Sequence, residues 1–420
     1  MKSIVFFYVI FLFGFSFAQE NIIASVEFKG ALKTKSSFLK KIIEVKHKEV
    51  LDSVKLDKDI IRLKRLPAIS HAYYQVFLTN DKKQYNVFYT VEENFTVIPN
   101  LNIWTSTNNQ FSYKIGLYDF NFLGHGVAFG GFYQNNGEDT YSVNFRAPYL
   151  FNKKMGLAIN HQNWKSEEPL YFENQSANYL YNNISLEVLG LYELNTAHKF
   201  NLGINIFNEK YQYVSGDVPL QVPRFLDLDK ILFKLLYDYD RLDYSYQYVS
   251  GFRSLLTLQS VSSDNKSQDD FFIGWNDLLY FKRVSSNGNW ASRLRVGLAT
   301  NSESPFAPFA LDNNLNIRGV GNLIDRGTGV ILLNTEYRHT VFEKDWFSLQ
   351  GNVFIDSGSW RKPGGDLDDF ISSENIKIYP GLGLRFIHKK IYNAIFRIDY
   401  GLGITKNSSK GIVFGIGQYF

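Results

Sequence analysis

The chain of 420 residues contains no cysteine, and it has no long apolar run beyond its first residues. Without cysteine it can form neither a disulfide framework nor the lipid attachment of a lipoprotein, and a metal site would need histidine and carboxylate ligands alone. No later segment is apolar for 18 residues, which excludes a bundle of membrane-spanning helices. The 45 basic and 41 acidic residues nearly balance, so we expect no nucleic-acid partner.

Sequence signals of an enzyme are also missing. The chain has no phosphate-binding loop and no G-x-S-x-G nucleophile elbow. Asp238, Asp240 and Asp243 stand among tyrosines, which suggests a cation site or, as the favoured interpretation, the rim of a hairpin. We therefore expect no enzyme activity, no cofactor and no metal. The seven histidines lack ligand spacing and are His47, His71, His125, His161, His198, His339 and His388.

The N-terminus has the three parts of a secretory signal peptide. Met1-Lys2-Ser3 carries a charge, residues 4–17 are apolar, and Ser16-Phe17-Ala18 ends in a small residue. These features predict a signal peptide over residues 1–18, cleaved after Ala18. A retained membrane helix is the alternative, but the run is shorter than the ~20 residues that span a bilayer, and no basic stop-transfer cluster follows it.

Residues 19–94 are predicted to form one small α+β domain, because helical periodicity occurs only there. Pro67 ends the second helix, and Asn80-Asp81-Lys82 forms the turn between the last two strands. A module of this size buries only a small core, so we expect modest stability. The predicted elements are a strand over 22–28, helices over 36–44 and 56–66, and strands over 69–79 and 84–92.

From Phe95 onward, alternating segments of roughly ten residues are separated by Asn, Asp, Ser and Gly clusters, the pattern of membrane-barrel strands. Aromatic residues make up 17% of the chain and the mean hydropathy is slightly negative, as expected of strands with a lipid face, a polar lumen face and aromatic girdles. A secreted β-sandwich has similar averages but does not need so long a series of strands. We predict an all-β membrane barrel of sixteen antiparallel transmembrane strands over residues 95–420. The strands are predicted over 97–105, 110–120, 125–135, 139–148, 154–165, 177–192, 198–212, 228–240, 250–261, 269–284, 289–300, 328–340, 345–357, 376–388, 391–403 and 411–420.

The alternation is clearest near the C-terminus. Phe396, Ile398 and Tyr400 alternate with Arg397 and Asp399, so one face is predicted to meet lipid and the other to meet water.

The final predicted strand runs to the terminal aromatic residue. Phe414 and Ile416 share one face, with Ile412 behind them and Phe420 at the end. A terminal aromatic on an amphipathic strand is what outer-membrane proteins present to their assembly machinery, although Gln418 replaces an aromatic. These four apolar residues are the predicted C-terminal outer-membrane signal.

At this point the sequence resembles the BamA, TamA and FhaC superfamily over nearly all of the mature chain. The segment 22–93, with its Val91-Glu92-Glu93 ending, is similar to one POTRA domain. Residues 116–126 resemble the family's early hairpin, and residues 147–150 resemble the turn that follows it. Residues 381–385 and 415–420 resemble its last strands. The resemblance implies a barrel in the Gram-negative outer membrane and a POTRA-like domain in the periplasm.

The most specific match is Ile317-Arg318-Gly319-Val320, in the segment 302–327. The family places an Arg-Gly motif at the tip of a loop folded into the barrel, where the arginine pairs with acidic side chains of the wall. Glu336 and Asp356 are the candidates here, because alternation puts both on the lumen side. A guanidinium offers a carboxylate two donors at once, so we expect the pairing to fix the loop. An ordinary turn is the alternative, and Val320 replaces the family's usual aromatic, so we expect the tip to pack less firmly.

The resemblance implies an assembly, insertion or translocation factor. Its POTRA-like domain would capture a client strand along a sheet edge, and the barrel seam or lumen would pass the client on. The expected partners are outer-membrane lipid, unfolded outer-membrane or secreted client proteins, and accessory subunits. One alternative is a two-partner-secretion transporter or pore that exports a dedicated substrate, although such transporters usually have two periplasmic domains and a plugging helix. A structural or receptor barrel is the other alternative.

Overall fold

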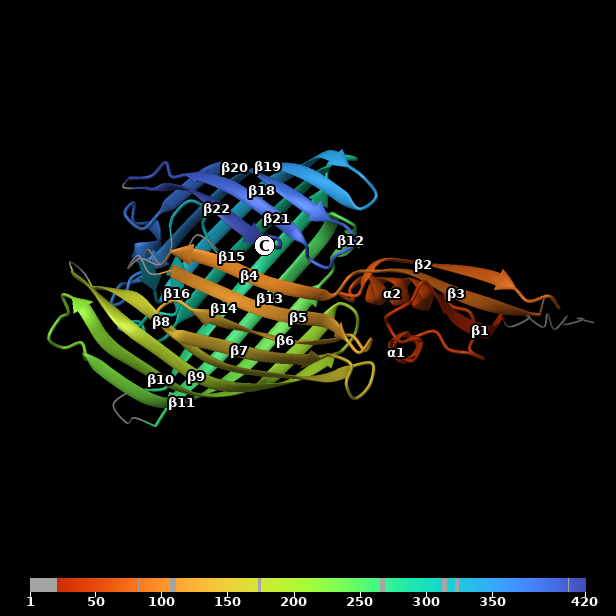
Figure 1. The fold of residues 1–420 in the computed structure, drawn as a ribbon, viewed down its shortest axis with the longest axis horizontal. Coiled ribbons are helices and arrows are strands. Elements are labelled where there is room, and N and C mark those ends of the chain that lie inside the picture. Colours follow the sequence, from red (N-terminus) through yellow and green to blue (C-terminus); the bar gives the residue numbers. More distant parts are fainter. Residues whose placement is uncertain are drawn as a thin grey trace, which may run out of the picture.

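The chain forms a small α/β domain and a barrel that are joined end to end (Figure 1). The computed structural model describes residues 21–81, 83–105, 111–172, 175–264, 269–304, 306–311, 316–321, 325–406 and 408–420. The predicted signal peptide over residues 1–18 lies outside these residues. Only residues 94–96 separate the last strand of the small domain from the first strand of the barrel.

The small domain has the predicted order of strand, helix, helix, strand and strand. Its sheet has the order β1-β3-β2, with β1 parallel and β2 antiparallel to β3, so β2 is an outer strand. The second helix starts three residues earlier than predicted, because the Asp52 side chain caps it by accepting the Val54 N–H at 2.8 Å. The elements are β1 (Ile22–Lys29), α1 (Ser36–Ile42), α2 (Ser53–Lys64), β2 (Ile69–Leu78) and β3 (Gln84–Glu93).

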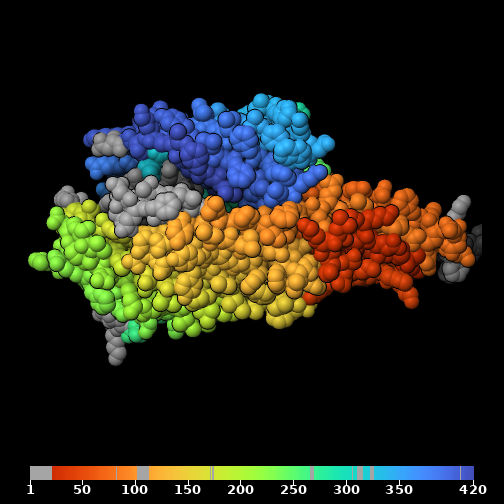
Figure 2. Space-filling model, viewed as in Figure 1, coloured from red at the N-terminus to blue at the C-terminus, as the bar shows by residue number. Residues whose placement is uncertain are grey.

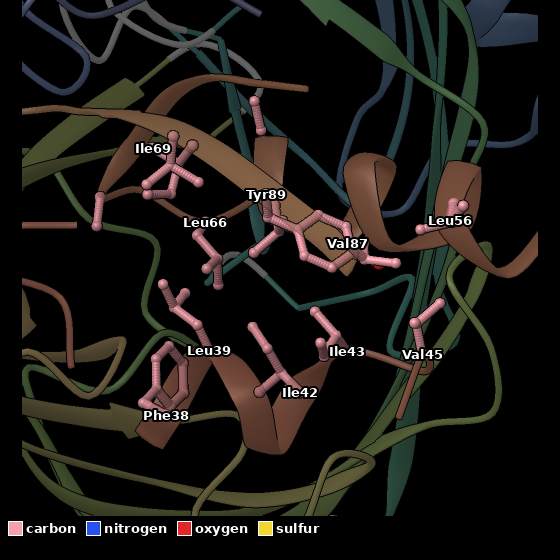
Figure 3. Packing of buried hydrophobic residues seen from close by; sticks show 14 of the residues in the cluster. Phe38, Leu39, Ile42, Ile43, Val45, Leu56, Leu66, Ile69, Val87 and Tyr89 are labelled. Carbon is pink, nitrogen blue, oxygen red and sulfur yellow. The ribbon is translucent and has the colours of Figure 1, made fainter. Parts of the chain in front are cut away.

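One compact core holds this domain together (Figure 3). Leu39 and Ile42 of α1 and Val87 and Tyr89 of β3 are fully buried in it. Asp59 of α2 is also buried, and its carboxylate accepts the Tyr89 hydroxyl at 2.7 Å and two backbone N–H groups. The core therefore contains a polar contact whose acceptor is satisfied.

The barrel is closed and antiparallel, and its described residues form one ring in which β22 lies beside β4. Each of the sixteen predicted segments contains a strand of this ring, and β12 (Asp243–Ser245) is a short extra strand paired with β13. No helix among the described residues is long and apolar enough to span a membrane. The strands are β4 (Val97–Thr105), β5 (Phe111–Phe122), β6 (Val127–Asn135), β7 (Asp139–Ala147), β8 (Met155–Phe172), β9 (Gln175–Glu193), β10 (His198–Gly216), β11 (Phe225–Asp240), β13 (Tyr248–Ser263), β14 (Phe271–Arg283), β15 (Gly288–Ala299), β18 (Gly329–Glu343), β19 (Phe347–Arg361), β20 (Lys377–His388), β21 (Ile395–Leu402) and β22 (Lys410–Ile416).

The first and last strands of the barrel lie side by side along one flank, where the orange and blue parts of the surface approach each other (Figure 2). The strands at this closure are short, with nine residues in β4, eight in β21 and seven in β22. In contrast, β8, β9 and β10 have 18 or 19 residues each. A short strand offers fewer ladder hydrogen bonds, so β21 and β22, the shortest of the sixteen wall strands, contribute fewer to the ring than the long strands do.

The predicted alternation of faces is confirmed. Phe396 and Ile398 are 54% and 42% exposed on the outside, whereas Arg397 and Asp399 are buried on the inside. The same inward position on neighbouring strands also carries charged side chains, so this part of the lumen wall is charged.

The last strand departs from the prediction. It ends at Ile416 rather than at the terminus, because Gly417 adopts a φ of 87° that turns the chain. Ile412, Phe414 and Ile416 point outward and are more than half exposed, whereas Phe420 packs on inward-facing residues of β14 and β15. The four residues of the predicted C-terminal signal therefore do not share one face.

Candidate functional site

The described part of segment 302–327 folds into the barrel, as predicted. It contains a small hairpin of β16 (Phe309–Leu311) and β17 (Asp325–Gly327), and its described tip is formed by residues 316–321. Ile317 and Val320 at the tip are 0% and 2% exposed, and they pack with Trp360 and Tyr379 of the wall. Although Val320 is smaller than an aromatic side chain, it is well covered.

Arg318 reaches both carboxylates that the sequence suggested. Its Nε and Nη2 donate to the two oxygens of Asp356 at 2.8 and 2.9 Å, and its backbone N–H donates to the same carboxylate at 2.9 Å. Its Nη1 donates to Glu336 at 2.7 Å. All three side chains are fully buried. The bidentate geometry with Asp356 requires a guanidinium, which a lysine cannot imitate.

The ion pair belongs to a larger network on the lumen face of β18, β20 and β21. Arg385 donates to Glu336 at 2.6 Å, and Arg338 contacts the same carboxylate. Asp399 accepts from Arg397 at 3.1 Å and lies 3.4 Å from Arg318. Sequence reasoning did not single out Arg338, Arg385 or Asp399 as partners, although strand alternation places each of them inside the barrel.

The network holds four guanidinium groups against three carboxylates. The guanidinium groups belong to Arg318, Arg338, Arg385 and Arg397, and the carboxylates belong to Glu336, Asp356 and Asp399. It therefore carries a net charge of +1 in a buried setting.

Glycines allow the loop tip to touch the last hairpin. A Cβ on Gly401 of β21 would lie 2.1 Å from the Arg318 carbonyl oxygen, and Gly319 at the tip adopts a φ of 94°. Ser409, just before β22, donates to the carbonyl oxygens of Gly319 and Val320, both at 2.9 Å. The tip is thus fastened to the two strands next to the closure.

A second group of contacts joins the small domain to the turns at one end of the barrel. Arg62 of α2 is buried and donates to Glu193 at 2.8 and 3.2 Å, and the Tyr149 hydroxyl donates to the other oxygen of Glu193 at 2.9 Å. Two of these residues come from barrel turns or strand ends, so the pair is buried only when the two parts are docked.

Further contacts extend this interface along the helices. Lys41 of α1 donates to the carbonyl oxygens of Tyr149 and Leu150, and a Cβ on Gly126 would lie 2.5 Å from the Phe38 ring. Lys64 forms an ion pair with Asp243 at 2.7 Å. The helical layer of the domain therefore covers the turns, and the outer strand β2 adds a stack of the His71 ring on Tyr246, with ring centroids 5.4 Å apart.

The aspartates that suggested either a cation site or a hairpin rim bind arginine and lysine side chains. Asp238 accepts two hydrogen bonds from Arg253, Asp240 accepts from Arg65, and Asp243 pairs with Lys64. Within the described ranges, no group of three or more histidine, aspartate or glutamate side chains could hold a metal ion.

A lumenal cavity of about 1980 Å³ lies on the side of the barrel opposite the small domain, beside the β16–β17 hairpin. Its lining includes Tyr181, Glu209 and Lys230 of the wall and Arg326 of the hairpin. Ion pairs connect Lys230 with Glu209 and Arg326 with Glu168. The cavity lining therefore combines paired charges with apolar side chains such as Phe306 and Leu226.

Comparisons with known proteins agree with this architecture. The family model "POTRA: Surface antigen variable number repeat" matches residues 21–94. A comparison with curated proteins finds no match.

Solved structures resemble the chain over most of its length. BamA from Haemophilus ducreyi lacking POTRA domains 1–3 is 15% identical with a TM-score of 0.57, and the match covers 94% of this chain and 83% of that one. CdiB from Escherichia coli is 12% identical with a TM-score of 0.61, covering 94% and 76%. CdiB from Acinetobacter baumannii is 13% identical with a TM-score of 0.62, covering 94% and 73%. The predicted fold, a POTRA domain ahead of a barrel like those of BamA and CdiB, is therefore confirmed.

Proposed function

We propose that this chain is an outer-membrane protein that inserts other polypeptides into the membrane or moves them across it. The observation that carries the proposal is the position of the POTRA domain, which is docked on the turns at the mouth of a closed barrel while β2 remains an outer strand. An outer strand can bind an extended segment of another chain through backbone hydrogen bonds. The similarity to BamA and CdiB supports the same role.

The outer surface of the barrel supports a membrane location. Leu382, Phe396 and Phe414 are 62%, 54% and 70% exposed, and such a band of apolar side chains is stable where it faces lipid. In this location the POTRA domain lies in the periplasm. We infer no enzymatic role, and the partners are outer-membrane lipid and unfolded client proteins, together with any accessory subunits.

Membrane insertion is the first of two routes for the client. The short strands β21 and β22 favour opening at the closure, and Ser409 holds the loop tip beside it. The second route is export of a dedicated substrate through the lumen, as in a two-partner secretion transporter. The large lumenal cavity, with charged and apolar side chains in its lining, and the similarity to CdiB favour that candidate.

Deleting residues 22–93 in the producing cell tests these roles. If the chain assembles barrels, many other barrel proteins are lost from the outer membrane, whereas loss of a single exported protein supports secretion. An unchanged outer-membrane and secreted proteome would contradict both the assembly role and the secretion role, and it would favour a structural or receptor barrel.

A sharper variant tests strand capture by β2. The double substitution Tyr73→Lys and Phe77→Lys places charges on exposed apolar positions of this strand, which are 44% and 51% exposed. Leu32→Lys is the matched control, because Leu32 is 92% exposed and lies outside the sheet. We expect the double variant to show the same loss of outer-membrane or secreted proteins as the deletion of residues 22–93, and we expect the control to show no loss.

A further inference from the structure

The last residues of the chain leave the barrel wall and enter the lumen. Gly417 donates its N–H to the Ile395 carbonyl oxygen at 2.8 Å, and its positive φ then turns the chain inward. Residues 418–420 belong to no strand, and Figure 1 marks the C-terminus against the middle of the barrel. Arg385, which lines the lumen, donates to the side-chain oxygen of Gln418. The terminal segment is therefore a lumen occupant rather than the end of a membrane strand.

The ring of Tyr419 lies among guanidinium groups. Its centroid is 4.5 Å from the central guanidinium carbon of Arg318, 4.8 Å from that of Arg397 and 5.8 Å from that of Arg293. Tyr419 is only 5% exposed. Arginine attracts the face of an aromatic ring, and the attraction is stronger where water is excluded.

The ring of Phe420 occupies a neighbouring position across the lumen. It lies 5.6 Å from the guanidinium carbons of both Arg293 and Arg338, and it packs on Leu279 and Phe281. Two adjacent aromatic rings are thus held by arginines and an apolar floor that come from different strands.

Two of these arginines have N–H donors that are not used in hydrogen bonds among the described residues. Arg338 Nη2 and Arg397 Nε are buried and have no hydrogen-bond partner among the described residues. Buried donors favour a bound acceptor, such as the carbonyl oxygens of a peptide. The site therefore offers both ring and backbone recognition.

We propose that the lumenal arginines 293, 318, 338 and 397 form a binding site for an aromatic segment of a passing polypeptide, which the chain's own Tyr419-Phe420 fills in the resting state. This inference rests on the proposed function, because a passing polypeptide is its ligand. A tethered segment has an effective concentration in the mM range, so it excludes a dilute competitor until it is released. The tail is then a resting-state competitor that a client displaces.

Peptide binding to the purified protein in detergent tests the site. The probe is a fluorescent peptide with the sequence of residues 415–420, followed by anisotropy, and the comparison is between the full chain and a variant that ends at Gly417. We expect the truncated variant to bind the peptide at least tenfold more tightly than the full chain. A peptide with both aromatic residues replaced by alanine should bind neither protein.

Two further variants locate the binding and guard against misfolding. Arg293→Gln in the truncated chain should weaken binding at least tenfold. Arg295→Gln is the control, because Arg295 also faces the lumen of β15 but pairs with Asp277 at 2.7 Å. If the truncation does not fold, the full chain with Tyr419→Ala and Phe420→Ala replaces it.

The outcomes separate this inference from the proposed function. Equal binding to the full and emptied chains, or equal effects of the two arginine variants, would overturn the inference. The binding assay involves no transport, so its result does not depend on the phenotype of the 22–93 deletion, which tests the proposed function.

Discussion

Arg318 is the residue on which the inner loop depends. Its guanidinium and backbone N–H together give Asp356 three hydrogen bonds, and its central carbon lies 3.5 Å from the centre of the Phe354 ring. Removing one partner of a buried ion pair typically costs ~3–5 kcal/mol, because the other charge is left without compensation. Arg318 thus holds the loop tip against the barrel wall.

Arg318→Ala is expected to free the loop while leaving the barrel closed. Limited proteolysis of the full chain in detergent should show new cleavage between residues 302 and 327. Arg318→Lys should give an intermediate result, because an ammonium cannot bind Asp356 through two fixed donors. Arg253→Ala is the control, since Arg253 of β13 donates two hydrogen bonds to Asp238 of β11 on the wall, away from the loop tip. Unchanged protection in Arg318→Ala would contradict the role of the ion pair.

Glu93 of the POTRA domain predicts a dependence on pH. Burial acts to raise its pKa, but hydrogen bonds from Thr34 and from the backbone N–H groups of residues 32–34 outweigh this and hold the pKa below its usual value. A carboxyl group with a lowered folded-state pKa stabilises the fold above its unfolded pKa of about 4.3, and the benefit is lost as the pH falls through the folded value.

The loop at residues 30–35 should therefore loosen in acid. Hydrogen exchange of peptides covering this loop, corrected for the intrinsic effect of pH, is expected to accelerate between pH 5 and pH 3. In Glu93→Gln the loop should already be loose at neutral pH, and the acceleration should disappear. An acid response that survives in Glu93→Gln would assign it to another group.

At the scale of elements, the close contact between the loop tip and β21 depends on a missing side chain. A methyl group at position 401 would collide with the backbone of Arg318, so Gly401→Ala should push the tip away from the wall. Proteolysis within residues 302–327 should then increase as in Arg318→Ala, although every charged partner remains. Gly190→Ala is the matched control on β9, where the nearest atom lies 3.6 Å from the added carbon. If both variants stay protected, the glycine contact does not hold the tip.

The strands could be predicted from the sequence because their signal is local. Alternation with a period of two places Phe396 outside and Arg397 inside without knowledge of any other strand. The last strand was extended too far because Gly417 was read as one more alternating position. Its φ of 87° cannot be seen in an alternating pattern, because glycine is compatible with a turn as well as with a strand.

The site was predicted only in part for a related reason. Glu336 and Asp356 were found through alternation combined with the family motif, and the structure brings both to Arg318. Asp399 lies far along the chain, and its contact depends on β21 curving around the barrel. Ser409 gave no signal at all, because a serine before a strand is common in turns.

At the scale of the whole molecule, the docking of the POTRA domain fixes where its outer strand β2 lies relative to the barrel turns. Its helices pack on the turns, and β2, an outer strand of its sheet, contacts them near its start through the stack of His71 on Tyr246. Under the proposed function, a client bound along β2 would be held near the barrel turns only while the domain stays in this position.

Glu193 is the residue whose loss should release the domain. It accepts from both Arg62 and Tyr149, and it is 6% exposed, so Glu193→Ala removes the nearer carboxylate of a buried arginine and leaves it only the contact with Glu44 at 3.7 Å, at a cost of ~3 kcal/mol. Because the chain has no native cysteine, Lys64→Cys and Asp243→Cys can be joined by a short bismaleimide. We expect efficient crosslinking in this background and at least a tenfold slower reaction once Glu193→Ala is added. Glu209→Ala, which removes an ion pair with Lys230 on the lumen wall, is the control and should leave the rate unchanged. Equal rates in the two variants would mean that other contacts, such as those of Lys41, are enough to hold the domain at the mouth.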